Sequence, residues 1–380
     1  MTRARWRAAE GALLLVFAAA VSFSIALTEI TFLTALASRL VRAATGEPFR
    51  LRPRALLVTG LILAATWILA GVFSPAPAAS IARVSRLYQV FVVFLVAEWA
   101  ADPRWVERAV LAALIGSGIG AAAGLVVWLE GDRPRMMGVF STGMTSGNSS
   151  AMSLVGAVAA AVAWRGRKRI AAGVAEGLDG FALLATMTRS AWLGAGLGIL
   201  TVGTRPAARK WAVATILLLV LTVIAVPRFR ARGEVLGDPN EVTAKGRISL
   251  WLTGWELFRE RPILGWGLQD HYALIEAHRR PDATFHAGHF HSNAVQVAVS
   301  TGIVGTAAYL AFHLALLAGL WRRRRTWWGL AALGVWVAFE LAGFFDWSFG
   351  DAEVAYAFFL WMGLGSADNQ EQAGRLVDPA

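Results

Sequence analysis

The amino-acid sequence predicts an all-α, polytopic integral membrane protein with about 12 transmembrane helices. Hydrophobic residues make up 57% of its 380 residues and charged residues only 16%. Apolar runs of about 18 or more residues, long enough to cross a bilayer, recur along the chain. Many of the 17 tryptophans stand near the ends of these runs, as in the interfacial belts of membrane proteins. The net charge of +11 does not indicate nucleic-acid binding, because the basic residues cluster in the connections between the runs.

These basic connections orient the expected helices, since cytoplasmic loops carry the excess of lysine and arginine. The chain begins with MTRARWR, and the basic connections RLVRAATGEPFRLRPR, ADPRWVER, RGRKR, TRPAARK and WRRRR follow. The proline-containing segment SPAPAAS marks an outer turn. With both termini inside, the expected spans are residues 11–27, 29–44, 55–73, 84–100, 107–129, 149–164, 171–187, 190–203, 211–226, 293–320, 327–345 and 352–365.

The seventh expected span contains two acidic residues, Glu176 and Asp179. We retain it because without it the basic connection TRPAARK would lie on the outer side. Two ionisable groups at this depth either face the bundle interior and serve a function or lie near its inner mouth, and the sequence does not decide between these roles. The resulting organisation is transmembrane helices over 1–227, an outer loop over 228–292, three more transmembrane helices over 293–366 and a cytoplasmic tail over 367–380.

The outer loop is the long polar insertion of the chain and holds five of its six histidines. Its segment ISLWLTGWELFRE has a helical spacing of apolar residues, which predicts an amphipathic helix lying along the membrane surface against lipid. Gly246 and Arg247 come directly before this segment. We therefore expect Arg247 in the first helical turn. There it either helps free backbone N–H groups to hold an anion or contacts lipid headgroups or solvent, and the segment alone does not decide between these roles.

Three histidines close the outer loop just before the tenth span: His286, His289 and His291. Imidazole is a ligand for zinc or nickel, but no carboxylate lies among these histidines and the chain has no cysteine. We therefore expect no metal ion here. Ser292 or Asn293 then supplies the side chain that caps the following helix.

Arg189 stands at the outer membrane boundary, between the seventh and eighth expected spans. An arginine at this depth is costly unless it meets an anion or extends to the lipid headgroups. Its planar guanidinium matches the oxygens of a phosphate. Boundary arginines and intramembrane acids also fit a transporter of an anionic solute. Against a transporter, the sequence shows no internal repeat, and transport does not need a large amphipathic outer loop.

Three segments, in this order and placement, resemble the O-antigen ligase and O-antigen polymerase superfamily: TRSAWLG (188–194), GRxxLW…LFxExPILGWG (246–267) and HxHxxxxQVxxxxGIVG (289–305). The resemblance implies transfer of a glycan from an undecaprenyl-pyrophosphate carrier to an acceptor sugar hydroxyl. It implies that the reaction occurs at the periplasmic face of the bacterial inner membrane, without metal or another cofactor. The layout favours an O-antigen ligase with lipid A core as acceptor, and an O-antigen polymerase or a protein O-oligosaccharyltransferase remains an alternative.

The resemblance also implies roles for individual residues. Arg189 and Arg247 would stabilise the leaving pyrophosphate, and His291 would accept the proton of the attacking hydroxyl in a single, inverting displacement. The family usually has asparagine directly after this histidine, whereas this sequence has Ser292 there and Asn293 next.

Further contacts are expected around these three residues. Arg135, on another outer loop, and His289 are candidates for binding pyrophosphate or glycan. Acidic residues also stand in the connection between the last two spans, where they could bind acceptor hydroxyls: Asp346, Asp351 and Glu353. We expect this connection to be a solvated turn instead.

Overall fold

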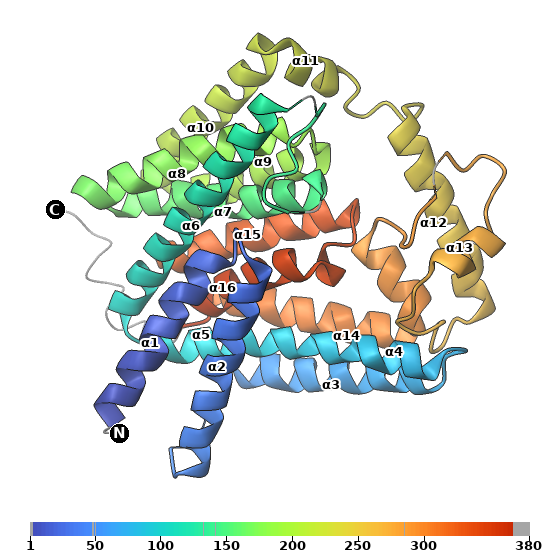
Figure 1. The fold of residues 1–380 in the computed structure, drawn as a ribbon, viewed down its shortest axis with the longest axis horizontal. Coiled ribbons are helices and arrows are strands. Elements are labelled where there is room, and N and C mark those ends of the chain that lie inside the picture. Colours follow the sequence, from blue (N-terminus) through green and yellow to red (C-terminus); the bar gives the residue numbers. More distant parts are fainter. Residues whose placement is uncertain are drawn as a thin grey trace.

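The computed structural model describes residues 3–47, 49, 51–131, 133–140, 142–284 and 286–367. Over these residues the chain is helical and contains no β-strand (Figure 1). The predicted cytoplasmic tail over 367–380 lies, apart from its first residue, outside the described residues. The elements are α1 (Arg3–Ala20), α2 (Ile25–Ala44), α3 (Arg54–Val72), α4 (Pro77–Val84), the 3₁₀-helix η1 (Ser85–Val90), α5 (Phe91–Trp99), α6 (Pro103–Glu130), α7 (Gly143–Ala163), α8 (Gly166–Ala185), α9 (Arg189–Gly203), α10 (Pro206–Ala225), α11 (Pro227–Glu234), α12 (Val242–Glu260), α13 (Tyr272–Ala277), α14 (Asn293–Arg323), α15 (Trp327–Phe344), the 3₁₀-helix η2 (Ser348–Gly350) and α16 (Ala352–Gly365).

The helices confirm the prediction of a helical, multi-pass membrane protein. Among the described residues, seven helical segments are long and apolar enough to cross a membrane: α3, the continuous segment from α4 through η1 to α5, α6, α7, α10, α14 and α15. α16 is a shorter apolar helix. The remaining expected spans are helical as α1, α2, α8 and α9, but they are too short or too polar to qualify. The number of 12 spans therefore stays a prediction.

The helices differ from the expected bounds of the first and fourth spans. The first expected span ran to residue 27, but α1 ends at Ala20 because Ser24 caps the next helix, its side chain accepting a hydrogen bond from the Leu27 N–H at 3.3 Å. The fourth was expected from residue 84, whereas the helical segment begins at Pro77. This earlier start adds Arg83 to a segment that already contained Arg86.

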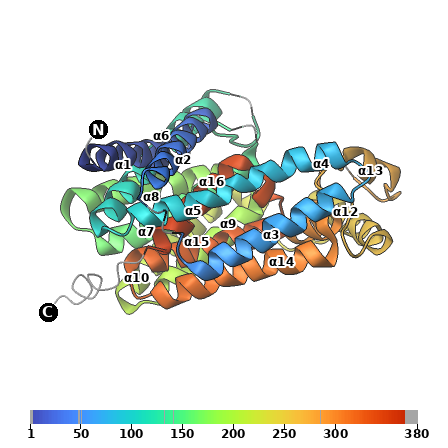
Figure 2. The ribbon, with the colours of Figure 1, turned by 90° about the horizontal axis from the view of Figure 1, so that it is seen from below.

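Predicted cytoplasmic connections meet at one end of the helices. Arg205 donates a hydrogen bond to the carbonyl of Arg325 at 3.1 Å, and Lys168 pairs with Glu107 at 2.5 Å. The start of α1 lies toward one end of the molecule, and α12 and α13 lie at the other (Figure 1, Figure 2). Each of these two contacts thus joins two connections that the positive-inside rule places on the same side.

Helix α7 lies in the middle of the bundle. It is rich in glycine, alanine and serine, and most of its residues are buried. It packs against α8, α9 and α15. Small residues let membrane helices approach closely, so α7 packs tightly against its neighbours and supports the connections at the α12 end. Its first turns carry Met144, Thr145 and Asn148.

The long helix α14 is broken at Gly302, whose backbone has φ 59° and ψ −164°. The N–H groups of Trp266 and Gly267 donate to the two carbonyls before the break, those of residues 299 and 300, at 2.8 Å each. The Ile303 N–H, just after the break, donates to the carbonyl of Pro262 at 2.8 Å. The PILGWG segment thus satisfies backbone groups that the break leaves free, as a membrane protein requires at that depth.

Substituting the glycine at the break should destabilise the protein. A Cβ at residue 302 would lie 2.2 Å from the carbonyl oxygen of Ile263, in a left-handed conformation. We expect Gly302→Ala to lower the free energy of unfolding by about 1–3 kcal/mol. Gly319→Ala, in the same helix, is the matched control because its Cβ would meet nothing within 4 Å. Thermal unfolding in detergent measures both variants, and equal midpoints would contradict the role assigned to the break.

Candidate active site

Two arginines share one carboxylate at the end of the molecule that carries α12. Arg189, the first residue of α9, is 9% exposed, and its guanidinium donates to Glu241 Oε2 at 2.6 Å and to the carbonyl of Val235. Arg232 of α11 donates to Glu241 Oε1 at 3.2 Å and to the carbonyl of Met187 at 3.1 Å. The helix junction before α9 and the segment that leads into α12 are thereby joined by ion pairs.

Glu241 is also the N-cap of α12. Its carboxylate accepts hydrogen bonds from the Ala244 N–H at 3.1 Å and from the Thr243 hydroxyl at 2.9 Å. Burial raises the pKa of Glu241, but the hydrogen bonds from Thr243, Arg189 and Ala244 outweigh burial and lower this pKa to about 2. A charged carboxylate of the chain itself therefore fills the anion position at the start of this helix.

The predicted position of Arg247 in the first helical turn is wrong. α12 begins at Val242, because Glu241 caps it, and Arg247 lies in the second turn. Arg247 forms no ion pair with a carboxylate of the described residues, and its Nη2 lies 3.7 Å from the sulfur of Met144. Burial lowers the pKa of Arg247; the Asp346 charge opposes this effect, and nearby cations add to it. Arg247 is thus a largely buried cation whose charge is not directly paired.

The neighbouring cations are Arg189 and Arg232, whose charges both act on Arg247. The charge of Arg135 also acts on Arg232, and Arg135 is itself exposed. We call this group of four guanidinium groups the arginine cluster: Arg135, Arg189, Arg232 and Arg247. Its four positive charges outnumber the two carboxylates that act on it, Glu241 and Asp346, which suits it to bind an anion with more than one negative charge.

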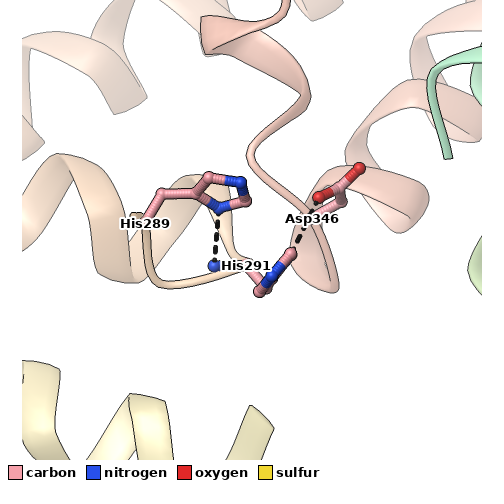
Figure 3. Close-up of side chains that lie close together, drawn as sticks. All are labelled: His289, His291 and Asp346. Atoms are coloured by element: carbon pink, nitrogen blue, oxygen red, sulfur yellow. Dashed lines mark hydrogen bonds and ion pairs between the residues drawn. The ribbon is translucent and has the colours of Figure 1, made fainter. Parts of the chain in front are cut away.

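His291 lies between His289 and Asp346 (Figure 3), and the charge of Asp346 also acts on Arg247 of the cluster. Its Nδ1 is 3.3 Å from Asp346 Oδ1, and its backbone N–H donates to His289 Nδ1 at 3.2 Å. The two imidazole rings are 4.2 Å apart. His291 has a φ of 46°, a left-handed conformation that is uncommon outside glycine and that clusters at functional sites.

The environment keeps His289 neutral. Burial, followed by the charge of His291, lowers the pKa of His289 to about 4.

Ser292 caps α14, its hydroxyl accepting from the Val295 N–H at 3.5 Å, so the capping prediction is confirmed for Ser292. The chain thus turns sharply at His291 and enters the helix at the next residue.

The expectation of a solvated turn after α15 is wrong for Asp346, which is 7% exposed. The connection is held down by Asn293, whose Oδ1 accepts a hydrogen bond from the Phe349 N–H at 3.0 Å. This amide therefore secures the connection that carries Asp346. Ser292, which stands where the family usually has asparagine, caps α14. Asn293, the next residue, instead holds the connection that carries Asp346.

Asp351 is likewise drawn into the protein. It accepts a hydrogen bond from the Thr145 hydroxyl of α7 at 2.6 Å. Burial, followed by a hydrogen bond with Glu353, raises the pKa of Asp351 to about 7. This hydrogen bond joins the connection after α15 to helix α7.

One group of side chains has the composition of a metal site. Donor atoms of His289, His291 and Asp346 all lie within 4.8 Å of one another. The third histidine of the predicted trio is elsewhere, since His286 is exposed and pairs with Glu276 at 2.9 Å. The same atoms also fit a hydrogen-bonded His–Asp pair, in which the carboxylate orients the imidazole.

Residues 174–310 match the family model described as O-antigen ligase. The chain carries a domain of the O-antigen ligase and polymerase superfamily. A search of curated proteins gave no match. The O-antigen ligase domain contains Arg189, Arg247, His289 and His291, and the rest of the chain supplies Arg135 and Asp346 to their surroundings.

The structure of the O-antigen ligase domain adds two residues that sequence reasoning did not single out, Arg232 and Glu241. Arg232 belongs to the basic segment RFRARGE, which the sequence offers only as a polar stretch after a span. Glu241 is an uncommon type of N-cap, because serine, threonine, aspartate and asparagine are preferred there. Only the folded chain shows that Glu241 binds both Arg189 and Arg232.

The O-antigen ligase domain should lose stability in acid through His271, which is 1% exposed and accepts a hydrogen bond from Gln296 at 3.0 Å. Burial lowers the pKa of His271 from 6.5 to about 4. The folded state binds the proton more weakly than the unfolded state, so stability falls as pH drops from about 6.5 to about 4. Over this interval the wild type should lose up to about 3 kcal/mol more than His271→Gln. Thermal unfolding at both pH values tests this, and equal losses would contradict it.

Proposed function

We propose that the chain is a glycosyltransferase of the O-antigen ligase type. It transfers a glycan from an undecaprenyl-pyrophosphate carrier to a sugar hydroxyl of lipid A core, at the periplasmic face of the bacterial inner membrane. The observation that carries the proposal is the proximity of a His–Asp pair to a cationic cluster. Asp346 contacts His291, and its charge also acts on Arg247.

The proposed reaction is a single displacement at the anomeric carbon of the donor. The acceptor oxygen forms a bond to this carbon while the bond from the carbon to the pyrophosphate oxygen breaks. Negative charge grows on the leaving pyrophosphate, where Arg247 and Arg189 stabilise it. His291 takes the proton of the attacking hydroxyl, and Asp346 stabilises the resulting imidazolium. The products are an inverted glycosidic bond and undecaprenyl pyrophosphate.

The arginines enter this reaction from different starting states. Arg189 is already bound to Glu241 at 2.6 Å, whereas Arg247 has no ion pair with a described carboxylate. We infer that Arg247 is the first contact of the incoming pyrophosphate. Arg189 and Arg232, held in place by Glu241, provide the surrounding positive field, and Arg135 extends it toward the pyrophosphate. The neutral His289 is a candidate contact for the glycan.

Reconstitution tests the proposed reaction. Purified protein in proteoliposomes receives an undecaprenyl-pyrophosphate-linked glycan together with lipid A core, and mass spectrometry follows the products. We expect glycosylated lipid A core and free undecaprenyl pyrophosphate, and both should require the acceptor. Joined repeat units would indicate a polymerase, and a glycosylated protein acceptor an oligosaccharyltransferase. Flux of an anionic solute without glycan transfer would indicate a transporter and refute the proposal.

The His–Asp interpretation predicts activity without a metal ion. We expect the transfer rate to remain unchanged after extended treatment with EDTA, because the arginine cluster supplies the positive charge that a metal would provide. A matched sample receives zinc or nickel after chelation. A loss of activity that the added metal restores would show that His289, His291 and Asp346 bind an ion.

A further inference from the structure

A cavity reaches His289, and its lining contains none of the four arginines of the arginine cluster. It has a volume of about 250 Å³ and is bounded by α3, η1, the segment before α13 and the connection after α15. At about 30 Å³ per water molecule, this space holds about eight waters, which suits one sugar ring. Its wall combines aromatic rings with polar side chains: Trp67, Trp347, Phe349, Arg83, Arg86 and Gln89. We call this cavity the acceptor pocket.

The polar side of the acceptor pocket is aligned by a local change of helix type. η1 is a 3₁₀-helix, and it directly follows α4, which ends one residue after Arg83. A 3₁₀-helix has three residues per turn, so side chains three apart stand above one another. Arg86 and Gln89 therefore form a row that continues the position of Arg83. In a regular α-helix the same residues would diverge around the axis.

The charge in this row is only partly balanced. Arg83 lies 4.0 Å from Asp270. Arg86 forms no ion pair with a carboxylate of the described residues, and its guanidinium donates a long hydrogen bond of 3.5 Å to the carbonyl of Gly350. Positive charge inside a helical segment of a membrane protein commonly marks a binding site. The row therefore favours a ligand that carries a negative charge.

The aromatic side offers a stacking surface and a free donor. Trp67 is 3% exposed, and its indole Nε1 has no hydrogen-bond partner in the described part of the chain. Its ring meets that of Phe349 edge-on at 5.8 Å. Trp347 is half-buried beside Gly350, where a Cβ would come within 1.9 Å of its indole nitrogen. A sugar ring can pack its apolar face on such rings and accept the unused N–H through an oxygen.

We propose that the acceptor pocket binds an anionic sugar residue, phosphorylated or carboxylated, of the glycan acceptor. The proposal rests on the proposed function, because the pocket is assigned to the acceptor only if the arginine cluster binds the donor. The arginine cluster holds the leaving group, whereas the pocket is lined by His289 and by none of these arginines. A hydroxyl delivered past His289 meets His291 next, because the His291 N–H donates to His289 Nδ1.

Steady-state kinetics on the reconstituted full chain separates acceptor binding from donor binding. Arg86→Ala should raise the acceptor KM about tenfold or more, because a hydrogen bond to a charged group is lost, while the donor KM stays within about twofold. Trp67→Phe, which keeps a ring but removes the N–H, should raise the acceptor KM by several-fold. Arg259→Ala, at an exposed arginine of α12, is the control. An unchanged acceptor KM in Arg86→Ala, or a raised donor KM, would overturn the assignment.

Isothermal titration calorimetry tests the pocket independently of catalysis. Glucose 6-phosphate should bind the detergent-solubilised protein more tightly than either glucose or inorganic phosphate, and Arg86→Ala should remove this preference. Equal binding of phosphate alone, or an unchanged preference in Arg86→Ala, would refute the pocket. Absence of transfer by the wild type, with the binding preference intact, would refute the proposed function and leave the anionic sugar site standing.

Discussion

His291→Ala should reduce the rate of glycan transfer by about 10²–10⁴-fold, the usual contribution of a positioned general base. The imidazole contacts Asp346 at 3.3 Å and is held by a backbone turn with φ 46°, so another side chain cannot easily replace it. Asp346→Asn should produce a smaller loss, because the amide keeps the shape but not the charge that stabilises an imidazolium. Transfer is measured in proteoliposomes at saturating donor and acceptor.

His286→Ala is the matched control for this experiment. The residue belongs to the same predicted trio but is exposed and pairs with Glu276. We expect its transfer rate to equal that of the wild type. Near-normal transfer by His291→Ala, with unfolding midpoints unchanged, would remove the histidine from the proposed mechanism.

Arg247→Ala should reduce transfer by about 10²–10³-fold, comparable to the loss of one transition-state donor in other enzymes. The residue is largely buried without an ion pair to a described carboxylate, so its removal takes away positive charge that the protein holds for an anion. Arg247→Lys should recover only part of the activity, because a lysine cannot present two parallel donors to a phosphate. The rate constant and the donor KM are measured separately.

Arg259→Ala serves as the control on the same helix, since this arginine is exposed. It should leave the rate constant and the donor KM unchanged. If Arg247→Ala retained more than about one tenth of the activity, pyrophosphate stabilisation would have to be assigned to Arg189 and Arg232 alone.

The sequence was sufficient to predict the helices because their apolar runs are long and are separated by basic connections that indicate their orientation. It also offered Arg189, Arg247 and His291 as candidates. In the folded chain, Arg247 is affected by the charges of Arg189 and of Asp346, which contacts His291. Their catalytic roles stay a prediction. Asp346 was named but expected in solvent, because its partner His291 is 55 residues away. Burial at such a distance depends on how α14 and α15 pack, which local patterns do not encode.

The helix start at Val242 escaped prediction for a different reason. The four residues before Gly246 have no apolar periodicity, and a glutamate N-cap is a weak signal. The additional turn moves Arg247 away from the helix end and places Glu241 there instead. Sequence patterns therefore selected Arg247 as a candidate but did not show that Glu241, and not a bound anion, lies at the start of its helix.

The hydrogen bonds that join the PILGWG segment to the break in α14 limit how this enzyme can move. A loop tied to a membrane helix at that point cannot swing open as a hinged lid between turnovers. A lipid-linked donor is therefore expected to arrive sideways from the bilayer and to meet Arg247 first, while Arg189 and Arg232 stay bound to Glu241. The rigid attachment at one end of the loop therefore determines how the donor reaches the site at the other end.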